Sequence, residues 1–339
     1  MPDYVAFGGR LRSDLRFPWL RPAPPDPAAA TWTLASGVVA TPQSGSDLIG
    51  EDEIGDGSSV RLYREPDRHV IVYDGLATFE LRADRITWCA EPGVPAELIR
   101  LCVIGRVFAS VLHLSGALCL HGGAVELGGR GLAFLAPPGT GKSTLVRALV
   151  ASGARLAADD SIPVEAGEPS LMRPGIAAMR IGSVRDRAAA EGPERSEEDA
   201  DEVEGEIIET RIEPTASEHP LVAAATAKRF VVPPAERAFG EGMIPLGAVY
   251  LLSPVAAGAE PAARRERLSG AQAMVSLLGN ARSGGLAAQS WVPALLERCA
   301  RLAASTPVYR LEIARDLARV GEVVAEIVGW HGPRPEAGS

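Results

Sequence analysis

The sequence contains few aromatic residues and little positive charge. Phe, Trp and Tyr make up 5% of its 339 residues, so its core is expected to consist of Ala, Val, Leu and Ile side chains rather than rings. Collagen, a globally disordered chain and a coiled coil are excluded by the hydrophobic and charged fractions, 46% and 23%, which are those of an ordinary globular protein. Glycine (36) and proline (27) are abundant and predict many turns.

The shortage of positive charge also restricts the partners. The formal net charge is −9, whereas nucleic acids and anionic membranes attract a positive field, so neither is expected as a partner. The longest apolar stretch, residues 98–120, contains Arg100 and Arg106 and predicts a buried helix rather than a membrane span. The first ten residues include Asp3 and no apolar segment, which predicts no signal peptide and a cytoplasmic location.

Cysteine is also scarce. No two cysteines form a C-x-x-C pair, and no histidine lies at zinc-ligand spacing from them. We therefore expect reduced, buried thiols and no structural zinc. The four cysteines are Cys89, Cys102, Cys119 and Cys299.

Residues 1–94 predict a β-rich N-terminal domain. Its Pro-rich segment, residues 21–27, predicts a stiff connector because proline lacks the N–H that a central strand needs. No chemical motif occurs here, so an accessory or docking role is expected. Short apolar runs between turn residues predict strands at Thr31–Leu34, Ser59–Tyr63, His69–Tyr73, Ala77–Leu81 and Arg85–Cys89.

Residues 95–339 predict a larger α/β domain. Apolar residues at three- and four-residue steps predict a helix from Pro95 to about His113. Two apolar runs around Gly128-Gly129 predict a β-hairpin. A helix is then expected from Lys142 to Val150, followed by a strand from Arg155 that ends on Asp159-Asp160.

The rest of this domain alternates strands and helices. An acidic stretch, about residues 184–213 and densest at 191–213, predicts a solvated mobile loop whose position also suits a lid. Strands are expected at Lys228–Val232, Gly247–Leu252 and Val308–Ile313, and helices at Ser269–Leu278, Val292–Ala304 and Leu317–Val328.

The most informative motif is Ala136-Pro-Pro-Gly-Thr-Gly-Lys-Ser-Thr, which has Walker A spacing with Ala136 in place of the first glycine. Glycine lets the backbone approach phosphate closely, and the N–H groups of such a loop converge on phosphate oxygens at the start of a helix. Lys142 would contact the β- and γ-phosphates, and the Ser143 hydroxyl would bind Mg²⁺. The residues expected to bind the nucleotide are Pro138, Gly139, Thr140, Gly141, Lys142, Ser143 and Thr144.

A structural alternative is a glycine turn that caps an ordinary helix. It would place Lys142 in the first helical turn, where the helix dipole disfavours a cation. Because a strand is expected before the motif and a helix after it, nucleotide binding is the favoured interpretation.

Two adjacent carboxylates follow Lys142 at seventeen and eighteen positions. One helix and one strand fill this gap, so Asp159 and Asp160 are expected beside the phosphate loop. Neighbouring residues on a strand face opposite sides, which predicts different roles: one carboxylate binds Mg²⁺ and the other accepts a proton from an attacking hydroxyl. The alternative is an Asp pair that forms a turn at a strand end.

Three segments together resemble the catalytic core of HPr kinase/phosphorylase and its kinase-like relatives. They are His121-Gly-Gly-Ala-Val, the Ala136–Thr144 motif, and Gly153-Ala-Arg-Leu-Ala-Ala-Asp-Asp. The resemblance is dense over residues 118–165 and looser at Leu171-Met-Arg-Pro-Gly, Lys228-Arg-Phe-Val-Val-Pro and Val308-Tyr-Arg-Leu-Glu.

This resemblance implies a P-loop kinase fold akin to phosphoenolpyruvate carboxykinase. It also implies transfer of phosphate from ATP, with GTP still open, to a peptide or protein serine with Mg²⁺. Lys142 and Ser143 would be the phosphate and metal residues, Asp159 the general base and Asp160 the metal-side carboxylate. His121 would lie near the transferred phosphate as a catalytic residue.

The sequence also departs from that family. The later Ile-, Arg- and Gly-rich signature that supports phosphorolysis is missing, and an acidic stretch stands in its place. Phosphorylase activity is therefore not expected. The chain looks closer to the HPr-kinase-like proteins of peptide-modifying systems, including lasso-peptide biosynthesis, in which the acceptor is a precursor-peptide serine.

Other candidate residues also have structural interpretations. His121 fits a hydrogen-bonded hairpin histidine as well as a phosphate contact. Lys228 and Arg229 would supply charge in the transition state, although cations beside a strand are more often surface residues. Spacing alone does not rank three further arginines, Arg173, Arg180 and Arg282.

Two other functions remain open at this point. A small-molecule kinase would use Lys142, Ser143 and Asp159 in the same way but needs a closed pocket. A nucleotide-binding regulator without an acceptor would position water with Gln or a similar group, which the neighbourhood of Asp159 lacks. The carboxylate pair therefore favours transfer to a hydroxyl. No oligomeric state follows from the sequence.

Overall fold

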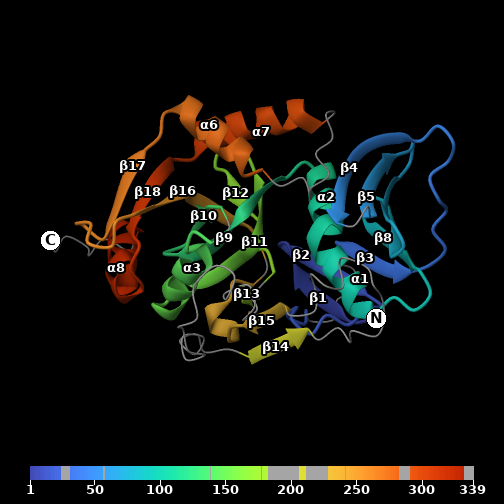
Figure 1. Cartoon of the computed structure of the whole chain (residues 1–339), viewed down its shortest axis with the longest axis horizontal. Helices are drawn as coiled ribbons and strands as arrows, with labels where there is room; N and C mark the ends of the chain where they lie inside the picture. The colour runs from blue at the N-terminus through green and yellow to red at the C-terminus, as the bar shows by residue number, and fades with distance from the viewer. Residues whose placement is uncertain are drawn as a thin grey trace.

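In the part of the chain that it describes, the computed structural model shows a mixed α/β protein with three β-sheets. In Figure 1 the strands of residues 47–90 lie on one side of the molecule and the sheet that carries the glycine-rich loop lies on the other, with the helical segment of residues 96–114 and the first two strands between them. The structure describes residues 1–23, 31–55, 58–137, 139–176, 178–181, 206–210, 228–240, 242–281 and 291–331.

The N-terminal sheet has eight strands in the order β1-β2-β3-β8-β7-β6-β5-β4. All five strands predicted from apolar runs are present, and three were missed. β4 was missed because it carries acidic residues rather than an apolar run, β1 because it has only four residues, and β2 because its sequence, GRLRS, has one apolar side chain. The bounds are β1 (Asp3–Ala6), β2 (Gly9–Ser13), β3 (Trp32–Ser36), β4 (Asp47–Gly55), β5 (Ser58–Arg64), β6 (His69–Tyr73), β7 (Ala77–Leu81) and β8 (Arg85–Ala90).

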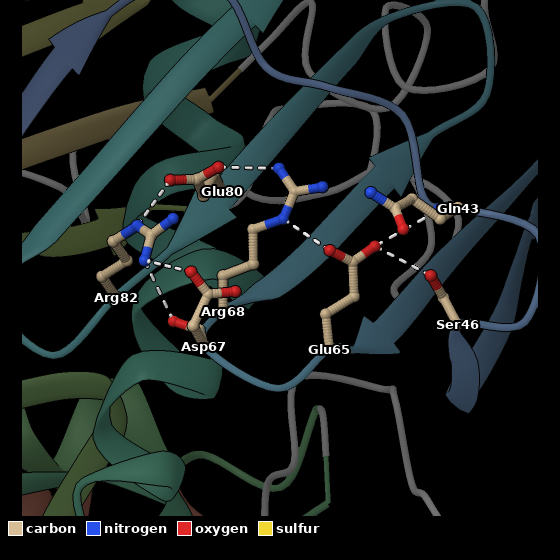
Figure 2. Close-up of polar contacts among 7 residues, drawn as sticks. All are labelled: Gln43, Ser46, Glu65, Asp67, Arg68, Glu80 and Arg82. Carbon is tan, nitrogen blue, oxygen red and sulfur yellow. Dashed lines mark hydrogen bonds and ion pairs between the residues drawn. The ribbon is translucent and has the colours of Figure 1, made fainter.

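A network of charged side chains links the turns of this sheet (Figure 2). The Arg68 side chain is only 9% exposed, and it donates to Glu65 Oε2 at 2.6 Å and to Glu80 Oε2 at 2.7 Å. Glu65 also accepts from the Ser46 hydroxyl, and Glu80 from Arg82. The hydrogen bond from Arg68, followed by that from Ser46, lowers the pKa of Glu65 to about 2. The network joins the segment before β4, the β5–β6 turn and β7.

The helix predicted from Pro95 is present, but it is interrupted. It divides into α1 (Ala96–Cys102), a π-helical segment (Val103–Val107) and α2 (Phe108–Leu114), because Gly105 has non-helical angles, φ −91° and ψ −108°. Phe108 in α2 contacts the rings of Phe7 and Trp32. One cluster of buried residues therefore extends from the N-terminal sheet through these helices into the second sheet.

The second sheet has seven strands in the order β10-β9-β11-β12-β16-β18-β17, and β10 also pairs with β16 in parallel. The predicted hairpin is confirmed: β9 and β10 are antiparallel around Gly128-Gly129. β12 and β17 were not predicted. The bounds are β9 (Leu118–Leu127), β10 (Arg130–Leu135), β11 (Arg155–Glu165), β12 (Leu171–Met172), β16 (Ile244–Val255), β17 (Ala263–Arg267) and β18 (Val308–Ala314).

Helices cover both faces of the second sheet (Figure 1). Phe134 of β10 belongs to the same buried cluster as residues of α3 (Lys142–Ala151) and α8 (Val320–His331). Its neighbour Leu135 belongs to the cluster that includes residues of α6 (Gly270–Gly279) and α7 (Val292–Ser305). The alternation of side chains along β10 thus places α3 and α8 on one face and α6 and α7 on the other. The helix predicted at Leu317 begins as a 3₁₀ turn, Leu317–Arg319.

The acidic stretch, which was predicted to be a loop, contains a strand of a third, small sheet. Residues Glu206–Thr210 form a strand, β14, that pairs with β15 (Lys228–Val232), and β15 pairs with β13 (Met179–Ile181). The prediction followed the acidic composition and gave no weight to Ile207-Ile208, an apolar pair inside it. Residues 182–205 and 211–213 lie outside the described residues.

The cysteine prediction holds in part. All four are free thiols and three are buried, but Cys89 is exposed. No helix in the described ranges is long and apolar enough to cross a bilayer.

Acid is expected to destabilise the protein through His113 in α2. This side chain is 4% exposed and stacks on Trp291. Burial, followed by the charge of Arg298, lowers its pKa from 6.5 to about 4. Below pH 6.5 the unfolded chain therefore binds more protons at His113 than the folded protein does. The stability that neutral His113 contributes is fully present above that pH and is lost as the pH falls toward 4. Between pH 7 and pH 5 this one group should remove about 2 kcal/mol of the free energy of unfolding.

Urea unfolding of the wild type and of His113→Gln at both pH values measures this contribution. Glutamine keeps an acceptor for Arg298, which donates to His113 Nδ1 at 3.3 Å, but it does not titrate. The variant should lose less stability than the wild type between pH 7 and pH 5. Equal losses would show that His113 does not contribute to the acid sensitivity.

Candidate active site

The loop between β10 and α3 places the predicted phosphate-binding residues at the start of a helix. Gly139 and Gly141 have φ of +77° and +92°, a region that side chains disfavour. Gly141 is the N-cap of α3 and has no side chain, so it forms no side-chain hydrogen bond to the first backbone N–H groups of the helix. Thr140 Oγ1 donates to the Pro137 carbonyl at 2.6 Å and closes the turn. Pro138 lies outside the described residues.

Lys142 is held against β9 at the first position of α3. Only 8% of it is exposed, and Nζ lies 3.2 Å from Nε2 of His121 and 3.4 Å from the carbonyl oxygen of Ala136. Its ammonium group therefore stays at the mouth of the loop. Ser143 and Thr144 follow in the first turn of α3 and are half-buried.

His121 links Lys142 to the carboxylates. Its Nδ1 lies 3.1 Å from the carbonyl oxygen of Asp160 and 3.4 Å from the Oδ1 of that residue. Because an ammonium can only donate, Nε2 accepts from Lys142 and the ring proton is assigned to Nδ1, which donates to Asp160. The His121 amide donates to Asn280 at the end of α6, at 2.7 Å. The ring is thus oriented by Lys142 and Asp160, and the main chain that carries it is held by Asn280.

The sequence predicted a strand that ends on the two acids, but the strand in the structure continues past them. β11 continues to Glu165, because Ile162 and Val164 remain buried and pair with β9. The register shifts between Leu156 and Ala158, which marks a β-bulge just before the acids. Asp160 has a φ of +72°, a conformation that non-glycine residues adopt only when their surroundings compensate for its cost.

The two carboxylates have different surroundings. Asp160 lies beside His121, whereas Asp159 pairs with Gly123 of β9. A Cβ placed on Gly123 would lie 3.8 Å from Asp159 Oδ1 and 2.8 Å from Val146 Cγ2 of α3. The Asp159 carboxylate therefore lies beside Gly123 of β9, the strand against which α3 packs. This difference in surroundings is compatible with the separate roles predicted for Asp159 and Asp160.

The oxygen ligands that the site offers would bind Mg²⁺ only if a phosphate supplied further ligands. Among the described residues no group of three or more His, Cys, Asp or Glu could hold a metal ion. Mg²⁺ usually binds one or two carboxylates and takes its remaining ligands from phosphate oxygens and water. The Asp160 carboxylate and the Ser143 hydroxyl supply the kinds of oxygen that such a shared ion needs.

Of the remaining candidates, the structure describes the side chain of Arg173. Arg173 forms an ion pair with Glu165 at the far end of β11. The side chains of Arg180, Lys228 and Arg229, and all of Arg282, lie outside the described residues. The sequence analysis missed Asn280, because it contributes a main-chain carbonyl, and such a contact leaves no signal in residue type.

In comparisons with known proteins, the chain shows similarity only in structure, and only weakly. No protein-family model matches the chain, and no curated protein matches it. Among 46 matching chains of solved structures is the HPr(Ser) kinase/phosphatase from Coxiella burnetii. The alignment covers 62% of this chain and 96% of that chain, with 11% identity and a TM-score of 0.27. A match at this level supports no conclusion about chemistry, so the functional argument depends on the contacts around Lys142.

Proposed function

We propose that the protein is a Mg²⁺-dependent kinase that transfers the γ-phosphoryl group of ATP to a serine hydroxyl of a peptide or protein. The observation that carries this proposal is the chain of contacts Lys142–His121–Asp160 at the mouth of a glycine-rich loop, with Asp159 next to it. An ordinary helix cap has no need for a buried lysine and a carboxylate pair at the same point.

In this proposal each residue has a separate task. Lys142 and the loop amides bind phosphate oxygens and stabilise their negative charge. Asp159 orients the serine hydroxyl and accepts its proton as the oxygen attacks the γ-phosphorus. The new bond joins serine oxygen to phosphorus, the bond from phosphorus to the β–γ bridging oxygen breaks, and ADP leaves.

Ser143 and Asp160 would hold Mg²⁺, which supplies positive charge to the phosphates when it is bound. His121 has a positioning task. With its Nδ1 proton engaged by Asp160, its Nε2 faces Lys142 and keeps the ammonium group close to the loop.

The acceptor that we propose is a serine of a precursor peptide. This proposal is supported by the overall sequence resemblance to kinases of peptide-modifying systems. The site contacts themselves are equally compatible with a small hydroxylated acceptor, so the acceptor has to be tested directly.

Mass spectrometry tests the proposal. Candidate precursor peptides, especially any encoded beside this gene, are incubated with the protein, Mg²⁺ and ATP. The proposal predicts one added phosphate on a serine, and none when ATP or Mg²⁺ is left out. Phosphorylation of an added small alcohol, with every peptide unchanged, would instead identify a small-molecule kinase.

A further inference from the structure

The tight turn that joins β1 and β2 touches the part of the protein that supports the acids. Its two residues, Phe7 and Gly8, both have positive φ, +50° and +73°. In the described ranges Phe7 and Asp160 are the non-glycine residues with positive φ. Phe7 is fully buried, and its ring lies 4.9 Å from that of Phe108, which holds the turn in place. A bulky residue in this conformation indicates that the surrounding contacts determine it.

Gly8 lies against the segment that follows β12. A Cβ placed on Gly8 would lie 3.2 Å from Pro174 Cδ, 3.3 Å from Arg173 Cβ and 3.4 Å from the carbonyl oxygen of Gly242. The backbone of the N-terminal turn is therefore packed closely against residues 173–174, and a side chain on Gly8 would fit only if these neighbours moved by a few tenths of an ångström.

The same segment spans the bulge of β11. The Arg173 amide donates to the Pro163 carbonyl at 2.9 Å, and the Gly175 amide donates to the Ala157 carbonyl at 2.7 Å. A Cβ placed on Gly175 would lie 2.9 Å from Ala158 Cβ and 3.0 Å from the Ser161 carbonyl oxygen. Segment 173–175 thus contacts β11 immediately before and immediately after Asp159-Asp160.

We propose that the Phe7–Gly8 turn is a positioning element for the catalytic acids, acting through segment 173–175. Asp160 has to be kept in an unfavourable conformation, and β9 supports it from one side only. Segment 173–175 supplies the support from the other side, and the N-terminal turn holds that segment in place. The effect on catalysis rests on the proposed phosphotransfer, because a displaced general base slows such a step. The N-terminal sheet thereby becomes a working part of the site.

Two glycine variants separate this role from ordinary packing. Gly8→Ala introduces a Cβ that must displace Pro174, whereas Gly45→Ala, at a φ of +105° in the same N-terminal region, meets nothing within 4 Å. Both variants impose backbone strain, but only the first presses on segment 173–175. Amide hydrogen exchange over residues 156–162 should be about tenfold faster in Gly8→Ala than in the wild type and unchanged in Gly45→Ala.

The kinetic readout uses the same pair. Gly8→Ala should lower the transfer rate at saturating Mg·ATP by about tenfold and leave the Kd for Mg·ATP within about twofold, since the phosphate loop is not displaced. Gly45→Ala should change neither value. Unchanged exchange at residues 156–162 in Gly8→Ala would overturn the proposal, and so would equal effects in the two variants.

A third variant covers the case in which Gly8→Ala does not fold. Pro174→Ala removes the ring that Gly8 touches and adds no strain to the turn; it should also speed exchange at residues 156–162. Wild-type protein that transfers no phosphate would refute the proposed function, while the exchange comparison would still decide whether the turn supports β11. The two proposals therefore fail on different measurements.

Discussion

Lys142→Ala is expected to reduce nucleotide-dependent phosphorylation by at least about 10³-fold while the protein remains folded. The ammonium group is the cation placed at the mouth of the loop, within hydrogen-bond distance of His121 and Ala136. Removing it leaves the developing charge on the transferred group without its main protein partner. The fold should persist, because alanine favours the helical conformation that Lys142 adopts at the start of α3.

The matched control removes a positive charge elsewhere. Arg267 is exposed on β17, a strand that pairs with β18 and not with β9, β10 or β11, so Arg267→Ala should leave the transfer rate unchanged. Transfer is measured with radiolabelled ATP, and folding is checked by circular dichroism. Undiminished turnover in Lys142→Ala would refute the phosphate role of the lysine.

Asp159→Asn is the second change with a large expected effect. An amide is similar in size to a carboxylate but cannot accept the serine proton, so transfer should fall at least about 10²-fold. Binding of Mg·ATP should remain within about threefold, because the proposal assigns metal binding to Asp160 rather than to Asp159. Asp84→Asn, in an exposed turn of the N-terminal sheet, is the control and should have wild-type activity.

A comparison with Asp160→Asn completes this experiment. That variant should weaken Mg²⁺-dependent binding and raise the Mg²⁺ concentration needed for activity. If Asp159→Asn transfers phosphate at close to the wild-type rate and Asp160→Asn does not, the base is Asp160, and the roles of the two acids are exchanged.

The sequence was informative wherever neighbouring residues decide the structure. The Gly128-Gly129 hairpin, the loop before Lys142 and the helix after it follow from local turn chemistry and apolar spacing, and the structure contains all three. The contact between His121 and Lys142 is different, because these residues are 21 positions apart. The family resemblance placed both residues near the phosphates, but neither the resemblance nor the spacing predicted that they contact each other.

Other features depend on contacts between distant parts of the chain. β10 lies parallel to β16, more than a hundred residues later, and no local pattern specifies that pairing. The acid pair was predicted to end a strand, because the apolar run that begins at Leu156 stops at these two residues. Pairing with β9 instead carries β11 past them, and Asp160 has a positive φ within the strand. The contact of Gly8 with Pro174 likewise depends on how the N-terminal sheet packs.

Calorimetric titration with Mg·ATP tests the central claim most directly, namely that the loop from Ala136 to Thr144 binds a nucleoside triphosphate next to the acids. The account predicts saturable binding of one nucleotide per chain, weakened at least about thirtyfold in Lys142→Ala and unchanged in Arg267→Ala. No binding to the wild type, or equal binding to the wild type and Lys142→Ala, would contradict it.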